Sequence, residues 1–323
     1  MRRADLEHLP RLPADFPLPL DVPFTTMTAR REAGLSARQL TWLVDQGFLR
    51  RLLRSVYVAS PVPDSLELRC AALRLVVPED AVICDRHAGW LHGADMVLAP
   101  NEHLYVAPVC VFLPTPGRRL RNGLAASGER GFRSGDVIEL YGLRVTSPLR
   151  TTWDLGRQRY GEWSLAAMDQ MFRLGLFSHD ELVAGVPRFR GMRWVTTLRA
   201  MVEYVDGRAE SPPESVLRLR WIQAHLPTPI PQLEVYDDEG TFLARLDLGA
   251  TDLPFAAEYD GDEWHSSPDQ LRRDRERRAL VEAETSYSIA VLRKENLFGP
   301  RADVESVLRR GVADARRRGG QPS

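Results

Sequence analysis

The sequence of 323 residues is poor in lysine and in cysteine, and it has no long apolar run. Lys294 is the only lysine among 43 basic residues, so a catalytic lysine has a single candidate. Three scattered cysteines, Cys70, Cys84 and Cys110, match no zinc-ligand spacing, and we expect buried free thiols in a reducing compartment. No run is long enough to span a membrane, and prolines interrupt the start where a signal peptide would be apolar. We therefore expect a cytoplasmic protein with no membrane association.

An excess of either positive or negative charge is also missing from the sequence. The net charge is −1, and the apolar and charged fractions of 44% and 27% are ordinary for globular proteins. Any affinity for nucleic acid must therefore come from local basic patches. The length favours two or three domains, and the pattern predicts an α+β multidomain chain that begins with an extended, proline-rich arm over residues 1–22.

Residues 23–60 carry the signals of a winged helix-turn-helix. A helix over Met27–Ala33 is expected to end at Gly34, a residue type that favours the left-handed backbone found after helices. Ser36 and Gln39 then form a capping box at the start of a second helix. Two strand-like runs follow and are interpreted as the wing: Phe48–Leu53 and Ser55–Ala59.

DNA binding is the function we expect of this region, because six arginines face only two acidic residues between Met27 and Tyr57. The second helix would enter the major groove with three side chains near its exposed start: Arg38, Gln39 and Trp42. The wing would contact phosphates through three more: Arg50, Arg51 and Arg54. The alternative is a small helical cap whose arginines are simply solvated.

Residues 61–205 form a predicted α/β middle domain with little recognisable chemistry, to which we assign a structural or regulatory role. Helices are expected over Leu66–Val77, from Asp85, and at three later segments, with strand-like runs between them at His103–Phe112 and Asp136–Val145; the later helices are Ser147–Tyr160, Ser164–Leu174 and Ser178–Ala184.

Three polar residues of the middle domain are interpreted as structural. His87 and His92 are five positions apart and do not share a helix face, and no third ligand lies nearby. They are therefore expected to pack or to join polar networks rather than to bind a metal. Asp154 is interpreted as a helix-face or salt-bridge residue.

A proline-containing linker over residues 206–213 is expected to separate the middle domain from a core over residues 214–323. After a helix that follows Ser211, the pattern predicts strands and helices in an order typical of a small α/β core: Leu233–Tyr236, Phe242–Gly249, Phe255–Asp260, a helix over residues 268–283, Tyr287–Arg293 and a last helix over Ala302–Arg318.

Carboxylates gather on one predicted hairpin of this core. If the loop Thr251–Pro254 closes symmetrically, Asp247 lies directly opposite Glu258, and both point to the same face of the hairpin. Strand alternation adds Asp260 to that face. Three carboxylates repel one another unless a cation lies among them, and a hard divalent metal with oxygen ligands is the usual answer.

The order of motifs in roughly the first 175 residues resembles the AbiEi-type antitoxins of bacterial abortive-infection systems. The resemblance rests on the winged-helix pattern followed by H-A-G-W-L-H-G from His87 and V-T-S-P-L-R-T-T-W-D-L-G-R from Val145. It implies a transcriptional autoregulator that counteracts a nucleotidyltransferase toxin within a toxin-antitoxin pair.

The region from Glu214 to about Phe298 is similar to very-short-patch-repair-like endonucleases of the PD-(D/E)xK superfamily. The motifs are E-S-x-L-R, L-D-L-G, E-Y-D-G, a histidine, R-x-x-D-x-x-R-x-x-x-L and V-L-R. The resemblance implies a restriction-endonuclease-like core in which Asp247 and Glu258 are metal-binding acids, with Glu214 as the acid of the first helix. Asp260 stands where the superfamily has a lysine, which removes the usual water-orienting cation.

A metal-dependent DNA endonuclease with Mg²⁺ or Mn²⁺ and no small-molecule cofactor is therefore the function we expect. Asp247, Glu258 and Asp260 would bind the metal, His265 would act as general base or phosphate contact, and Lys294 is the other basic candidate. Four arginines of the next helix would neutralise phosphates: Arg272, Arg273, Arg277 and Arg278.

Alternatives stay open for each of these residues. Glu214 follows Ser211 at the spacing of a capping box, and His265 has a structural interpretation as a hydrogen-bonded histidine. The arginine-rich helix has the pattern of a salt-bridged surface. For the chain as a whole, the alternatives are a transcriptional autoregulator with an inactive nuclease fold and a protein-contact scaffold.

Overall fold

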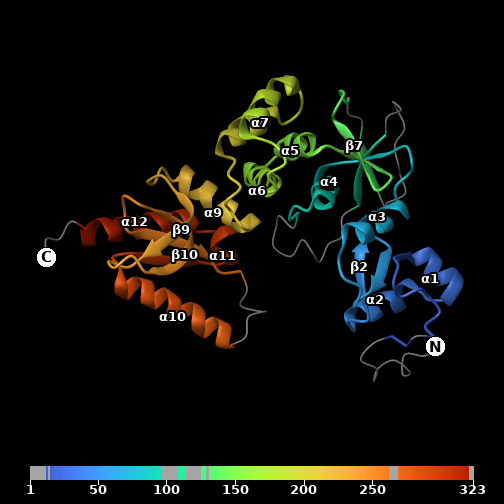
Figure 1. The fold of residues 1–323 in the computed structure, drawn as a ribbon, viewed down its shortest axis with the longest axis horizontal. Coiled ribbons are helices and arrows are strands. Elements are labelled where there is room, and N and C mark those ends of the chain that lie inside the picture. The colour runs from blue at the N-terminus through green and yellow to red at the C-terminus, as the bar shows by residue number, and fades with distance from the viewer. Residues whose placement is uncertain are drawn as a thin grey trace. The chain divides into compact units, whose positions relative to one another are not determined.

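The structure is a computed structural model that describes residues 12–13, 15–96, 108–113, 125–128, 131–261 and 268–319. The chain divides into two compact units (Figure 1). The first unit contains residues 1–93 and 101–154, and the second contains residues 94–100 and 155–323. This division falls inside the predicted middle domain over residues 61–205. In the part of the chain that the structure describes, no helix is long and apolar enough to cross a membrane.

The first unit begins with two short helices and a three-stranded antiparallel sheet whose strand order is β1-β3-β2. Their bounds are β1 Phe24–Thr25, α1 Thr26–Ala33, α2 Ala37–Asp45, β2 Leu49–Leu53 and β3 Val56–Ala59. The helix bounds and the β2–β3 pair agree with the sequence prediction, whereas strand β1 was not predicted. Two residues are too short a segment to show a strand period, and β1 is held by its pairing with β3.

The ends of these helices follow from individual residues. Thr25 accepts a hydrogen bond from the backbone N of Thr28 and so caps α1. Gly34 then adopts a φ of 64° and ends the helix. Ser36 and Gln39 form the predicted capping box of α2, and Gly47, with a φ of 75°, turns the chain into β2.

The rest of the first unit contains a five-stranded mixed sheet with the order β6-β5-β4-β8-β7 and three helices, of which α5 continues into the second unit. Their bounds are α3 Leu66–Arg74, β4 Val82–Ile83, α4 Asp85–His92, β5 Val109–Phe112, β6 Ala125–Gly128, β7 Val137–Leu140, β8 Leu143–Thr146 and α5 Pro148–Gly156. The expected strand His103–Phe112 is described only in its last part, as β5.

The run Asp136–Val145, predicted as one strand, is a hairpin of β7 and β8. Tyr141 and Gly142 form its two-residue turn with φ values of 47° and 74°. Positive φ at both central positions is the conformation that matches the twist of an antiparallel pair. The prediction was wrong here because a single glycine within an apolar run was not interpreted as a turn.

One apolar core joins the first three-stranded sheet to the five-stranded sheet. It includes Leu53 and Val56 of the small sheet together with Leu73, Ile83 and Val145 of the following segment. Residues 23–60 and the part of the middle region before residue 155 therefore share one core within the first unit.

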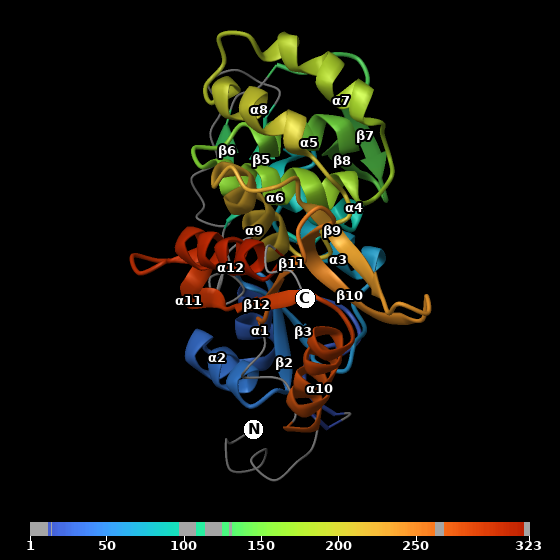
Figure 2. The same ribbon diagram turned by 90° about the vertical axis from the view of Figure 1, so that its left-hand side faces the viewer.

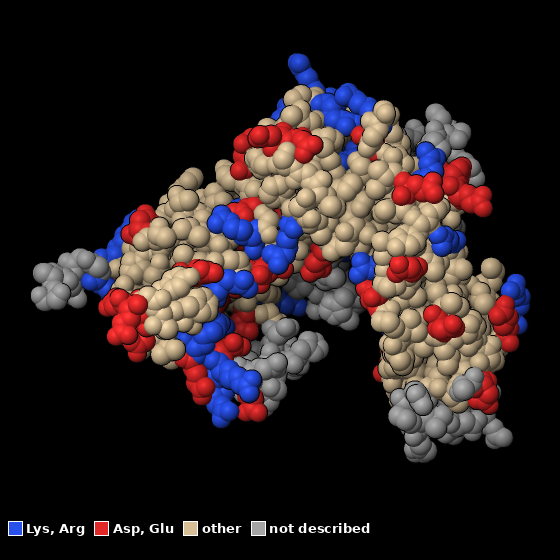
Figure 3. Space-filling model, viewed as in Figure 1, with Lys and Arg blue, Asp and Glu red and all other residues tan. Residues whose placement is uncertain are grey.

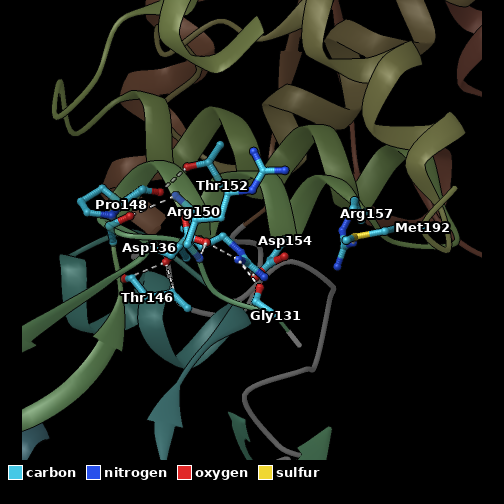
Figure 4. A network of polar contacts seen from close by, with 12 residues as sticks. Gly131, Asp136, Thr146, Pro148, Arg150, Thr152, Asp154, Arg157 and Met192 are labelled. Atoms are coloured by element: carbon cyan, nitrogen blue, oxygen red, sulfur yellow. Dashed lines mark hydrogen bonds and ion pairs between the residues drawn. The ribbon is translucent and has the colours of Figure 1, made fainter. Parts of the chain in front are cut away.

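An arginine buried with two carboxylates fixes the start of α5. Arg150 donates from Nη1 to Asp136 Oδ2 at 2.6 Å and from Nε to Asp154 Oδ2 at 2.9 Å. Nη1 also donates to the carbonyl oxygen of Gly131 at 3.0 Å. Each of the three charged residues is 3% exposed, and Figure 4 shows the guanidinium between its partners. The salt-bridge interpretation of Asp154 is confirmed.

The two histidines of this unit make hydrogen bonds to the backbone, and its three cysteines are free thiols. The Nδ1 atom of His87 accepts a hydrogen bond from the backbone N of Cys110 at 3.2 Å, and burial and then the charge of Arg86 lower the pKa of His87 to about 4. His92 Nε2 lies 2.8 Å from the carbonyl oxygen of Thr146. Their interpretation as polar-network residues is confirmed. All three cysteines are free thiols, with Cys110 half-buried and the other two buried.

In the second unit, helices pack across the predicted linker. The helices are α6 Gly161–Phe172, α7 His179–Gly185, α8 Val195–Met201 and α9 Pro212–Gln223. Helix α8 was not predicted. Arg218 of α9 donates to Asp169 Oδ2 of α6 at 2.6 Å, with both side chains buried. The carboxylate of Asp169 also accepts from the backbone N of Asp206, and Ala209 is 2% exposed. Residues 206–213 therefore lie within the second unit, against α6.

The remaining elements of the second unit form the predicted α/β core. They are β9 Ile230–Tyr236, β10 Phe242–Ala250, β11 Phe255–Tyr259, α10 Pro268–Glu284, β12 Ser288–Leu292, α11 Lys294–Leu297 and α12 Val304–Gly319. The sheet order is β12-β11-β10-β9, with β11 and β12 parallel and the other pairs antiparallel. The order and the approximate bounds of these elements agree with the sequence prediction, except that the short helix α11 was not predicted.

Helices cover both faces of this sheet. Figures 1 and 2 show α10 on one side and α9 with α12 on the other. On the α10 side, Val281 packs with Leu246 and Ala256. On the other side, Phe255 stacks on Trp221 of α9, and a Cβ atom at Gly311 of α12 would meet the Phe255 ring. A glycine in the middle of α12 thus permits the close approach of helix and strand.

Replacing Arg150 tests the importance of its buried network. Arg150→Ala is expected to lower the free energy of unfolding by about 3–5 kcal/mol, because it leaves Asp136 and Asp154 buried without a compensating charge. Urea denaturation monitored by tryptophan fluorescence measures the change. Arg144→Ala is the matched control, since Arg144 is exposed and makes a hydrogen bond of 3.4 Å to the Asp80 carbonyl oxygen. Equal effects of the two substitutions would contradict the assignment.

Candidate carboxylate site

The hairpin of β10 and β11 has the register that the sequence predicts. Leu248 pairs with Ala257 and Gly249 pairs with Ala256, and the same register continued by one pair would place Asp247 opposite Glu258. Asp247 Oδ2 also accepts a hydrogen bond from the backbone N of Tyr259 at 2.8 Å. The predicted register is therefore confirmed for residues 248–250 and 255–257, which pair across a turn that closes between Ala250 and Phe255. That Asp247 and Glu258 face each other one pair further along stays a prediction.

Glu258 is buried and ion-paired with two consecutive arginines of α10. Its side chain is only 4% exposed. Arg277 Nη1 donates to Oε1 at 2.8 Å, Arg277 Nη2 donates to Oε2 at 3.3 Å, and Arg278 Nε donates to Oε2 at 2.5 Å. An ionised carboxylate can be buried in this way only when opposite charge and hydrogen bonds compensate it. These contacts place Glu258 on the α10 side of the sheet, whereas Phe255 faces α9.

Glu214 serves as a cap at the N-terminus of α9 and also lies near Asp247. Its carboxylate accepts hydrogen bonds at 2.8 Å from Ser211 Oγ, from the backbone N of Glu210 and from Gln232 Nε2. The predicted capping box is only half formed: Ser211 Oγ accepts from the backbone N of Glu214, but the Glu214 carboxylate accepts from the backbone N of Glu210 rather than from that of Ser211. The charge of Glu214 also raises the pKa of Asp247.

The pKa of Asp247 is raised well above its ordinary value of 3.8. Burial raises its pKa to about 7, the charges of Glu214 and Glu258 add to the rise, and the Tyr259 backbone N and Arg277 act against it. A carboxyl group that is half protonated near neutral pH is typical of functional sites, although structural networks also produce it. Negative charge is crowded at this end of the hairpin.

Three further predicted site residues are Asp260, His265 and Lys294. The backbone N of Asp260 donates to the Leu292 carbonyl oxygen, and its Oδ2 lies 3.7 Å from Arg278 Nη2. Arg278 therefore contacts both Glu258 and Asp260. His265 lies outside the described residues, and Lys294 begins α11 directly after β12.

The four arginines assigned to phosphates fall into two groups. Arg277 and Arg278 reach inward to Glu258, whereas Arg272 and Arg273 are exposed. Arg272 lies 3.3 Å from Asp269 and 3.8 Å from Glu276, as the salt-bridged alternative predicts. Figure 3 shows basic and acidic residues side by side over α10.

Sequence reasoning missed two features of the site. It did not foresee that α10 supplies the partners of Glu258, because contact between a helix and a strand depends on how they pack. It also missed Gln232, whose φ of 54° interrupts the regular strand and whose side chain holds Glu214. No local pattern marks this glutamine.

Of the residues near the N-terminus that are predicted to bind DNA, some are exposed and others are engaged in contacts within the protein. Arg38, Arg51 and Arg54 are exposed. Gln39 is engaged in the capping box, and Trp42 is half-buried against Phe48 with ring centroids 6.2 Å apart. The remaining candidate, Arg50, donates to the carbonyl oxygen of Val62 at 2.7 Å.

The donor set at the hairpin fits a hard divalent cation in its chemistry. Asp247, Glu258 and Glu214 offer carboxylate oxygens, which Mg²⁺ and Mn²⁺ prefer. Burial is the main cause of the raised pKa of Asp247, and a cation would offset the negative charges of Glu214 and Glu258 that add to it. As arranged, however, no group of three or more His, Cys, Asp or Glu side chains within the described residues is placed to hold a metal ion. Arg277 and Arg278 occupy the Glu258 carboxylate instead.

These features define an α+β multidomain protein with a buried, carboxylate-rich centre in its second unit. No family model matches the chain. Two relatives from Mycobacterium tuberculosis, Uncharacterized protein MT2308 (strain CDC 1551 / Oshkosh) and Uncharacterized protein Rv2248 (strain ATCC 25618 / H37Rv), are each 32% identical over 250 residues, which is 77% of this chain and 87% of each relative. The chain belongs to the family of these mycobacterial proteins.

The comparison with solved structures adds little. The crystal structure of the RV2827C protein from Mycobacterium tuberculosis aligns with 68% of this chain and 84% of its own, at 14% identity and a TM-score of 0.29. Similarity this low supports no argument about the fold or function of the chain.

Asp247→Asn is expected to change how stability depends on pH. Because the folded-state pKa of about 7 lies above the ordinary value of 3.8, the folded protein holds this proton more tightly than the unfolded chain. Stability is therefore lost as the pH rises between these two values and stays lost above them. The variant should be the more stable protein at pH 8, by about 1–4 kcal/mol.

Urea denaturation of both proteins at pH 4.5 and pH 8 measures this effect. The variant's advantage should grow from the lower to the higher pH. An advantage that is the same at both pH values would show that the Asp247 proton is not held more tightly in the folded state.

Proposed function

We propose that the chain is a metal-dependent DNA endonuclease whose active centre is the Asp247–Glu258 pair. The observation that carries the proposal is the proximity of the buried Glu258 to the half-buried Asp247 on one hairpin, with the pKa of Asp247 raised to about 7. Stability alone gives no reason to crowd carboxylates in this way. Metal-assisted phosphodiester hydrolysis needs such a cluster, and the motif order of residues 214–298 supports the same chemistry.

Asp247 and Glu258 would hold the divalent cation, with Glu214 and Asp260 completing or orienting its surroundings. When bound, Mg²⁺ or Mn²⁺ would polarise the scissile phosphate and lower the pKa of an attacking water. Arg278, which contacts both Glu258 and Asp260, would hold both carboxylates in orientation. Arg272 and Arg273 would contact phosphates from the exposed side of α10, and His265 remains the proposed general base.

The first unit would place the protein on DNA. The order β1, α1, α2, β2 and β3, with a glycine turn between the helices, supports a winged helix-turn-helix. Arg38 on α2 and Arg51 and Arg54 on the β2–β3 pair are exposed and carry the charge that phosphate contacts require. A cytoplasmic location is part of the proposal, in keeping with three free cysteines.

A second candidate is a transcriptional autoregulator of the AbiEi antitoxin type that binds DNA without cutting it. The observation that favours it is the occupation of Glu258 by two guanidinium groups, together with an aspartate at position 260 where the superfamily has lysine. In that case the nuclease-like core would serve binding or dimerisation. A nucleotidyltransferase toxin would be the partner.

Cleavage of supercoiled plasmid distinguishes the two candidates. The full-length protein should nick or linearise plasmid with Mg²⁺ or Mn²⁺ and should be inactive with excess chelator. Asp247→Asn and Glu258→Gln should each lower the cleavage rate by about 100-fold or more, because each removes a charged metal ligand of the active centre.

Glu239→Gln is the matched control for these substitutions, since Glu239 is an exposed residue of the β9–β10 turn. It should cleave at the wild-type rate. Plasmid left intact by the wild-type protein with both metals, while DNA binding persists, would exclude the nuclease and favour the autoregulator.

Salt dependence of DNA binding tests the role of the small sheet. Arg51→Ala and Arg54→Ala should each weaken binding to a short duplex and reduce the slope of log affinity against log salt by roughly 0.9, the value for one lost phosphate contact. Fluorescence anisotropy in calcium buffer measures both quantities. Arg144→Ala removes an exposed arginine of the same unit and should leave the slope unchanged. Wild-type slopes in both wing variants would show that these arginines are merely solvated.

A further inference from the structure

The side chain of Arg277 binds the carboxylate of Glu258, which a bound metal cation would also need as a ligand. Its two terminal nitrogens donate to the two oxygens of Glu258 at 2.8 and 3.3 Å. One guanidinium therefore offsets the charge on both oxygens of the buried Glu258 carboxylate.

Arg278 differs from Arg277 in its contacts. It bonds one oxygen of Glu258 and approaches Asp260 at 3.7 Å. Its side chain is 16% exposed, whereas that of Arg277 is 32% exposed. Arg278 is the more buried of the two arginines, and Arg277 is the more accessible to solvent.

A second partner for Arg277 is already in place on α10. Asp274 lies one helical turn earlier, its Oδ1 atom is 3.8 Å from Arg277 Nε, and its side chain is 50% exposed. Residues at this spacing face each other on a helix surface. If Arg277 releases Glu258, it can therefore keep an ion pair with Asp274 at the protein surface. The same helix carries other exposed arginines.

We propose that Arg277 is an internal counter-cation of the carboxylate site, which a divalent metal displaces from Glu258 and which then binds a DNA phosphate. The proposal rests on the proposed endonuclease function. Metal and Arg277 compete for the same carboxylate, because its oxygens cannot serve both cations fully. Metal binding is thereby coupled to DNA binding, since displacement of Arg277 supplies a phosphate contact, and the coupling must act equally in both directions.

The test measures Mn²⁺ affinity of the full-length protein without DNA, by calorimetry and by electron paramagnetic resonance of free Mn²⁺. Arg277→Gln should bind Mn²⁺ about fivefold or more tightly than wild type, because the competitor is gone. Arg273→Gln, which removes an exposed charge from the same helix, should bind as wild type does. Arg277→Lys keeps the charge but not the bidentate contact, so a smaller gain is expected.

A second measurement follows the displaced side chain. Affinity for a short duplex should rise when Ca²⁺ is added to the wild-type protein, and this rise should be absent in Arg277→Gln. If wild type binds Mn²⁺ but Arg277→Gln binds it equally or more weakly, the counter-cation proposal is wrong and the endonuclease proposal stands. If no variant binds Mn²⁺, both proposals fail. Should Arg277→Gln not fold, unchanged Mn²⁺ affinity in Arg277→Lys would overturn the inference.

Discussion

The interaction on which both units depend is the buried pair of carboxylate and guanidinium. It occurs at Arg150 in the first unit, where α5 joins the loop before β7, and at Arg218 in the second, where α9 joins α6. It occurs again where α10 meets β11 at Glu258. Arginine suits this role because its planar group binds carboxylates with several hydrogen bonds and stays charged when buried. In each case one long side chain ties together elements that are distant in the sequence.

The three centres differ in their balance of charge, and this difference separates structure from function. Asp169 faces Arg218 and accepts a backbone hydrogen bond besides, and Arg150 is enclosed by its two acids. At the hairpin, by contrast, Glu258 takes two arginines, while the carboxylates of Asp247 and Glu214 accept hydrogen bonds from uncharged groups, among them the Tyr259 backbone N and the Gln232 side chain. A site with more carboxylates than nearby cations is costly to bury. A further cation at the hairpin would lower that cost, which supports the proposed metal site.

The sequence alone was sufficient for much of the local structure. Ser36 and Gln39 predicted the start of α2, Gly34 predicted the end of α1, and the loop at residues 251–254 predicted the register in which Leu248 pairs with Ala257. These features depend on neighbours within a few positions, where capping, turn geometry and strand alternation operate. The order of elements in residues 214–323 was predictable for the same reason. The hairpin at Tyr141 was missed because the turn carries only one glycine.

Tertiary packing decided the remainder. It placed the division of the chain near residue 155 rather than at residues 206–213, because α6 and α9 bury Asp169 and Arg218 between them. It turned Arg277 and Arg278 from the surface toward Glu258, and it brought Gln232 to Glu214. The sequence by itself determined the register of the β10–β11 hairpin, since pairing across a short turn is local. Only the folded chain determined which cations contact Glu258, because that choice depends on where a helix from another part of the sequence packs.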